Sequence, residues 1–128
     1  MESSEMESSD IDIAGVDAEK GLSLYYGEMD IYLQALQSYA VNVPATIDKI
    51  RSVSKETLGD YAIYLHGIKG TSANIGAEKT RTAALELELL AKNGDISGVL
   101  AKNENFIKET EAIVAGIKAW LEQYNVNI

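Results

Sequence analysis

Apolar residues recur three and four positions apart along most of this chain, which is the spacing of one face of an α-helix. The clearest series begin at Tyr32, Leu58 and Leu100, and a shorter one runs from Thr80 to Ala91. No stretch alternates apolar and polar residues as a half-buried strand does. The pattern predicts an all-α protein, which we interpret as an antiparallel up-down four-helix bundle with a short covering helix at its N-terminus.

Capping residues set the expected limits of these helices. Asp17 is a candidate N-cap for the short helix, expected over residues 18 to 26, and Ser97 is a candidate N-cap for the last helix. Gly76 and Gly94 stand where the two preceding helices should end, because glycine readily adopts the left-handed conformation of a C-cap. These capping residues therefore mark where the predicted helices begin and end.

Two long helices make up much of the expected core. The first spans residues 28 to 53 and contains Pro44, which lacks an amide donor, so this segment is either kinked or built from two abutting helices. The last helix has one apolar row from Leu100 to Tyr124. A second row repeats every seven residues and comprises Val99, Phe106, Ile113 and Trp120. So wide a stripe is typical of a helix in a bundle interior.

Composition and charge limit the possible domain organisation and the possible classes of partner. The 128 residues, 46% of them hydrophobic, suit one compact domain. Residues 1–10 are acidic and serine-rich and are expected to be a disordered leader or linker, with the bundle over residues 11–128. The absence of cysteine excludes disulfides and thiolate sites, and a net charge of -9 opposes nucleic-acid binding. Since no apolar run could span a bilayer, we expect a cytoplasmic protein without membrane contact.

The only histidine, His66, lies on the side of its helix that faces away from the apolar stripe. At about 100° per residue the stripe comprises Tyr61, Leu65, Ile68, Ser72 and Ile75. The opposite side comprises His66, Lys69, Gly70, Ala73 and Ala77. An exposed imidazole of this kind is accessible to a large partner.

The neighbours of His66 favour phosphate chemistry over metal binding. Lys69 is a helical neighbour whose ammonium could offset the charge of a phosphoryl group, whereas it would repel a metal cation. No second histidine or cysteine is available as a metal ligand. Gly70 leaves open space beside the imidazole, which lets another protein approach. The candidate site is therefore His66, with Lys69 as counter-charge to a phosphoryl group and Gly70 as clearance for a partner, and a metal site is disfavoured.

The run from His66 to Ala77 resembles the signature of histidine-containing phosphotransfer (HPt) domains, in which Lys and Gly follow the histidine by three and four positions and a Gly-Ala pair closes the run. Further matching positions are Ala84, Leu87, Glu88, Asn93 to Asp95, and Ile13 to Asp17 with Leu22. The resemblance covers about residues 11 to 121. Thr80 and Gly67 depart from the usual pattern, since the family usually has an aliphatic residue at the first position and seldom has glycine directly after the histidine.

The resemblance implies a phosphorelay intermediate in two-component signal transduction. His66 would accept a phosphoryl group through Nε2 from the aspartyl phosphate of a response-regulator receiver domain and pass it to another receiver. Lys69 would stabilise phosphoryl charge and Gly70 would permit docking, while the receiver would supply Mg²⁺. The domain would be a phosphocarrier and not an enzyme, without autokinase activity.

Several alternatives stay open from the sequence. A helical adaptor that binds receivers without phosphotransfer is the main one, whereas a kinase core is disfavoured because Gly67 stands where such kinases usually have an acidic residue. We expect a monomer and the C-terminal domain of a hybrid sensor histidine kinase, although a free-standing protein fits too. The expected docking patch comprises the Tyr25 and Tyr26 segment with Ala62, Ala73 and Ala77.

Overall fold

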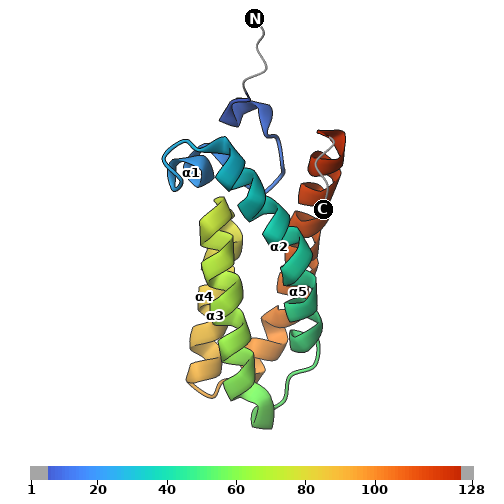
Figure 1. The fold of residues 1–128 in the computed structure, drawn as a ribbon. Coiled ribbons are helices and arrows are strands. Elements are labelled where there is room, and N and C mark those ends of the chain that lie inside the picture. Colours follow the sequence, from blue (N-terminus) through green and yellow to red (C-terminus); the bar gives the residue numbers. More distant parts are fainter. Residues whose placement is uncertain (1–5, 125–128) are drawn as a thin grey trace, which may run out of the picture.

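The computed structural model of the chain describes residues 6–124 and contains five α-helices (Figure 1). They are α1 (Ala18–Ser23), α2 (Met29–Ile50), α3 (Leu58–Ile75), α4 (Glu78–Lys92) and α5 (Ile96–Gln123). Two short 3-10 helices, η1 (Ser8–Asp10) and η2 (Lys55–Thr57), complete the regular structure of the described part, which has no strand. The all-α prediction is confirmed.

The four long helices pack in sequential order. α2 contacts both α3 and α5, and α4 likewise contacts both α3 and α5. Successive long helices run in opposite directions, and α1 lies at the end of the molecule where α2 begins (Figure 1). There α1 contacts α3 and α2, as expected of a short covering helix.

Local capping chemistry explains most helix ends. The Asp17 carboxylate accepts from the Lys20 amide at 3.1 Å and so caps α1. Gly76 and Gly94 adopt φ of +85° and +73° after α3 and α4, which confirms both predicted stops. The cap of α5 differs from the prediction, because Asp95 accepts from the Gly98 amide at 2.8 Å and the helix begins before Ser97.

Two of the expected helices have different limits in the structure. α2 continues through Pro44 as one helix, which excludes two abutting helices, and it ends at Ile50 instead of Val53. α1 ends at Ser23, so Tyr25 and Tyr26 lie in the turn that follows it. These differences are small shifts at helix ends and leave the order of elements unchanged.

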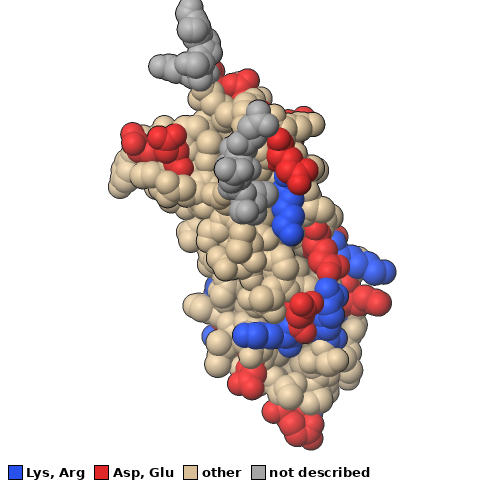
Figure 2. Space-filling model, turned by 45° about the vertical axis from the view of Figure 1, so that its right-hand side comes forward, with Lys and Arg blue, Asp and Glu red and all other residues tan. Residues whose placement is uncertain are grey.

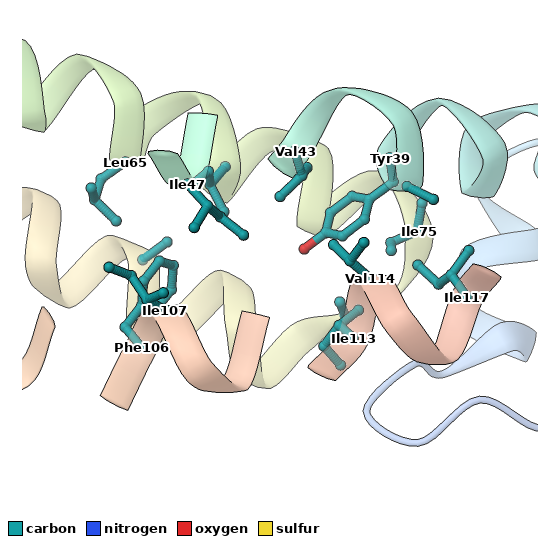
Figure 3. Close-up of a cluster of buried hydrophobic side chains, with 14 of the residues drawn as sticks. Tyr39, Val43, Ile47, Leu65, Ile75, Phe106, Ile107, Ile113, Val114 and Ile117 are labelled. Atoms are coloured by element: carbon teal, nitrogen blue, oxygen red, sulfur yellow. The ribbon is translucent and has the colours of Figure 1, made fainter. Parts of the chain in front are cut away.

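Apolar side chains of α2, α3 and α5 point toward one another in the core (Figure 3), to which α4 adds Ala84, Leu87 and Ala91. Both predicted rows of the last helix contribute, since Phe106, Ile113 and Trp120 are buried together with Ile117. The ends of the first row do not, because Leu100 and Tyr124 are exposed. The periodicity thus located the buried face of α5 but overestimated its length.

Buried hydrogen bonds join the helices at several levels. The Tyr39 hydroxyl lies 3.0 Å from the Ser72 hydroxyl, which connects α2 to α3. The Tyr61 hydroxyl donates to the side-chain oxygen of Asn103, whose amide group donates to the Ile50 carbonyl, both at 2.7 Å. Because these polar atoms are paired inside the core, burying them does not carry the full cost of desolvation.

The N-terminal segment contacts the last helix. Ser8–Asp10 form η1, and the Trp120 indole donates to the Asp10 carbonyl at 3.2 Å. This part of the segment expected as a leader therefore has a defined conformation. Residues 1–5 lie outside the described residues, so for them a disordered leader stays a prediction.

On the face seen in Figure 2, basic and acidic side chains are interspersed and leave large uncharged areas between them. This face offers no continuous basic surface of the kind that nucleic acids bind. None of the helices within residues 6–124 combines the length and the hydropathy that a membrane-spanning segment requires.

Candidate functional site

His66 lies in the middle of α3, on the side that faces away from the core. The predicted stripe on the other side is fully confirmed, because its members Tyr61, Leu65, Ile68, Ser72 and Ile75 are all buried. The His66 side chain is 67% exposed. The helical periodicity thus accounts for the position of the imidazole, which is open to solvent.

A buried carboxylate from the neighbouring helix holds one nitrogen of this imidazole. Glu88 projects from α4 toward α3, and its Oε2 lies 2.9 Å from the His66 Nδ1. The Glu88 side chain is only 2% exposed. One edge of the ring is therefore fixed to the protein, while most of the ring faces solvent.

Two lysines complete the environment of Glu88. The Lys69 ammonium donates to Oε1 at 2.7 Å, and the Lys92 ammonium lies 3.0 Å from Oε2. The carboxylate thus has three partners, from α3 and α4, and both of its oxygens are engaged. Such pairing makes a buried charge tolerable, because each oxygen exchanges its bonds to water for charge-assisted bonds.

The pKa of Glu88 follows from two opposing effects. Burial favours the neutral acid and by itself raises the pKa of the carboxyl. Hydrogen bonds from Lys69, Lys92 and His66 outweigh burial and lower the pKa to about 2. Glu88 is therefore an anion at neutral pH.

The charge of Glu88 determines the tautomer of His66. A carboxylate can only accept hydrogen bonds, so the Nδ1 atom that contacts it must carry the proton. In the neutral imidazole the lone pair then lies on Nε2. Within the described part of the chain no side chain hydrogen bonds to Nε2. In that neutral tautomer the site presents a solvent-facing Nε2 lone pair that can act as a nucleophile.

The other two predicted site residues lie along the same helix. Lys69 is close to the imidazole, but its ammonium is on Glu88 and its side chain is 24% exposed. At Gly70 an added Cβ would meet no other atom within 4 Å, so the surface beside the ring is open. The geometry is compatible with both predicted roles, which stay predictions.

A hollow of about 510 Å³ lies beside the imidazole between α3 and α4. His66, Glu88 and Lys92 line it together with apolar residues. The apolar lining comprises Leu58, Ala62, Ile63 and Ala91. The Ile63 side chain is exposed, so a partner that covered the imidazole would also bury apolar surface here.

The docking patch expected from the sequence is only partly accessible. Ala62 and Ala77 are buried, and Ala73 is partly buried. Ala77 is buried because it caps α4 and lies beyond the end of α3, where the helical spacing no longer applies. Tyr26, by contrast, is 94% exposed, and Tyr25 is held at the end of α3 by a 2.9 Å hydrogen bond from its hydroxyl to the Asn74 carbonyl.

Sequence reasoning missed Glu88 and Lys92 as members of the site. Glu88 follows Ala84 by four residues and so lies within the apolar stripe of its helix. A charged residue at such a position indicates a buried side chain with a functional role. Lys92 follows Glu88 by a further four residues, which is the spacing of a helical ion pair. Within residues 6–124, no group of three or more His, Asp or Glu side chains is arranged to hold a metal ion.

The stability of the domain is expected to depend on the charge of Glu88 in acid. Because the pKa in the folded protein, about 2, lies below the usual value of 4.5, the ion cluster contributes above pH 4.5 and is lost as the pH falls toward 2. Glu88→Gln should lower the free energy of unfolding by about 1 to 2 kcal/mol at pH 7. This is less than the free energy equivalent to the whole pKa shift, because solvent screens the exposed Lys92. Urea unfolding of both proteins at pH 7, 4 and 2.5 measures this difference, which should shrink as the pH falls. A constant difference would contradict the assignment.

Comparison with known families agrees with this geometry. The model of the Hpt domain family matches residues 21–123, which include His66 and all three of its charged neighbours. No curated protein and no solved structure matches the chain significantly. The family match covers most of the chain. The protein therefore belongs to the Hpt domain family, whose members are phosphocarriers of two-component and phosphorelay signalling.

Proposed function

We propose that this domain is a phosphorelay intermediate that accepts a phosphoryl group on Nε2 of His66 from the aspartyl phosphate of a receiver domain and passes it to another receiver. One observation carries the proposal: the buried Glu88 carboxylate engages Nδ1 at 2.9 Å and leaves the lone pair of an exposed imidazole on Nε2. An inert surface histidine would need no such buried, ionised partner.

The transfer step follows from this arrangement. The Nε2 lone pair attacks the phosphorus of the aspartyl phosphate, a P–N bond forms, and the P–O bond to the aspartate breaks with its electron pair on the leaving carboxylate. The phosphorylated ring then carries a positive charge, which the Glu88 carboxylate stabilises through the Nδ1 proton. The reverse attack by the aspartate of a second receiver regenerates neutral His66.

The neighbouring residues support this step in different ways. Glu88 keeps the proton on Nδ1 and orients the ring. Lys69 adds positive charge near the imidazole, although its ammonium is on Glu88 and so acts on the phosphoryl group through space. The open surface at Gly70 admits the receiver. The apolar lining of the hollow then provides a surface that the receiver can bury.

The proposal extends to the setting of the domain. We infer that α2 to α5 form an antiparallel four-helix bundle, that the domain acts without autokinase activity, and that the receiver supplies the Mg²⁺ that neutralises the transferring oxygens. We further propose a monomeric, cytoplasmic domain that serves as the C-terminal part of a hybrid sensor histidine kinase.

Transfer from a phosphorylated receiver tests the function. The purified chain is mixed, without ATP, with receivers from the same genome that carry ³²P, and we expect the label to appear on His66. Two-dimensional ¹H–¹⁵N NMR of the imidazole should show Nδ1 protonated before transfer and phosphorus bonded to Nε2 after it.

The possible outcomes are distinct. Transfer without ATP, at a site mapped to His66, supports a phosphocarrier. Stable binding of receivers without transfer would leave a helical adaptor, and a proton on Nε2 of the neutral ring would remove the observation that carries the proposal. Labelling by ATP alone would contradict the absence of autokinase activity.

A further inference from the structure

Lys92, the last residue of α4, is a second lysine beside His66. Its ammonium lies 3.0 Å from Oε2 of Glu88, and the same oxygen lies 2.9 Å from the His66 Nδ1. Because both atoms contact one oxygen, the ammonium is separated from the ring nitrogen by no more than the sum of these distances. Lys92 is therefore a neighbour of the imidazole in space, although 26 positions separate the two residues in the sequence.

The two lysines on Glu88 are held with different strength. Lys69 makes the shorter contact, 2.7 Å, and its side chain is 24% exposed, whereas the Lys92 side chain is 58% exposed. Lys92 and Glu88 form an i,i+4 pair on one helix in which only the lysine is exposed, and Oε2 of Glu88 keeps its contact with His66 when the Lys92 ammonium leaves. Lys92 can therefore exchange its contact for another at small cost. If Lys69 left Glu88, a buried oxygen would lose its charged partner.

The lining of the hollow beside the imidazole also distinguishes the two lysines. Lys92 lines it together with His66 and Glu88, whereas Lys69 does not. A cation that lines the open space next to the ring can reach a group bound to the ring without any movement of a helix. The long, flexible stem of lysine allows this movement.

We propose that Lys92 is the cation that contacts the phosphoryl group on His66, whereas Lys69 is a positioning residue that holds the Glu88 carboxylate. This inference rests on the proposed function of His66. The phosphoryl oxygens accept hydrogen bonds from the Lys92 ammonium. No proton is transferred from Lys92, and no covalent bond to it forms or breaks. The transition between the free and the phosphorylated state then includes a swing of Lys92 from Glu88 to the phosphoryl group.

Chemical phosphorylation gives a test that needs no receiver. Phosphoramidate transfers phosphoryl groups to imidazoles, and because His66 is the only histidine the product has one phosphohistidine signal in ³¹P NMR. The pH at which this signal titrates reports the charge next to the phosphoryl oxygens. Lys92→Gln is expected to raise the midpoint by about half a pH unit, since the dianion loses its neighbouring cation. Lys92→Arg should restore it.

Two further variants separate contact from general charge and from positioning. Lys102 is a matched control, because it is 51% exposed and forms a similar pair with Glu86 at 3.1 Å without contacting His66. Lys102→Gln removes the same charge and should leave the midpoint unchanged. Lys69→Gln should shift the midpoint less than Lys92→Gln does but lower the fraction of imidazole protonated on Nδ1, as measured by ¹⁵N NMR.

Any of three results would overturn the assignment. An unchanged midpoint in Lys92→Gln means that the ammonium does not contact the phosphoryl group, and an equal shift in Lys102→Gln means that only overall charge matters. A larger shift in Lys69→Gln would assign the contact to Lys69. The proposed function fails separately, through absence of transfer from receivers, because chemical labelling of His66 does not depend on it.

Discussion

Glutamine in place of His66 is expected to abolish phosphoryl acceptance, with a loss of at least about a thousandfold, while the fold stays intact. An amide nitrogen has no lone pair available for attack on phosphorus, whereas the imidazole Nε2 does. The His66 side chain is largely exposed and Oε2 of Glu88 keeps Lys92 as a partner, so the free energy of unfolding should change by no more than about 1 kcal/mol. Transfer of ³²P from a phosphorylated receiver and urea unfolding measure the two quantities.

Asn105→Gln provides the matched control for this variant. Asn105 is an exposed residue of α5, and α5 packs against α2 and α4 on the other side of the molecule from the exposed face of α3. This variant introduces the same side chain and should accept phosphoryl groups at the rate of the unchanged protein. Residual labelling of His66→Gln would show that another residue accepts the phosphoryl group.

Alanine in place of Gly76 is expected to destabilise the domain by about 3 kcal/mol or more. Gly76 has a φ of +85°, which costs alanine about 1 kcal/mol, and an added Cβ would lie 2.2 Å from the carbonyl oxygen of Asp17. The Gly76 carbonyl also accepts from the Asp17 amide at 2.9 Å, so the two backbones cannot separate without losing that bond. Urea unfolding at neutral pH measures the loss.

Gly94→Ala separates backbone strain from close approach. Gly94 has a similar φ of +73°, but an added Cβ there would meet nothing within 4 Å. This variant should cost only about 1 kcal/mol. If both alanine variants cost the same, the contact between the end of α3 and the start of α1 contributes nothing to stability.

The sequence predicts the fold class and the exposed position of His66 because both depend on local spacing. Apolar residues three and four positions apart lie on one face of α3, whichever helices pack against that face. His66 does not belong to this series, so its imidazole points away from the core. The stops at Gly76 and Gly94 were equally predictable, since glycine is the residue that tolerates the left-handed conformation. Asp95 and Ser97 are both good caps two residues apart, and only the structure shows which one is used.

The environment of the imidazole could not be predicted from local spacing. Glu88 lies 22 positions after His66, and its contact with Nδ1 depends on how α3 and α4 pack and on the rotation of each helix about its axis. The place of Glu88 in the apolar stripe of α4 indicates burial, but local spacing does not show which side chain of α3 it contacts. The sequence therefore identifies the candidate acceptor, and the structure adds the carboxylate that contacts one of its two ring nitrogens.

The open surface along α3 has an evolutionary consequence. Added methyl groups at Gly59, Gly67 and Gly70 would meet no neighbouring atom, so alanine there would disturb neither the packing of the helix nor the Glu88 cluster. Substitutions at these positions are therefore expected to change the binding of a partner protein more than the stability of the fold. Duplicated copies of such a domain can therefore diverge in partner choice while keeping the same interior and the same chemistry.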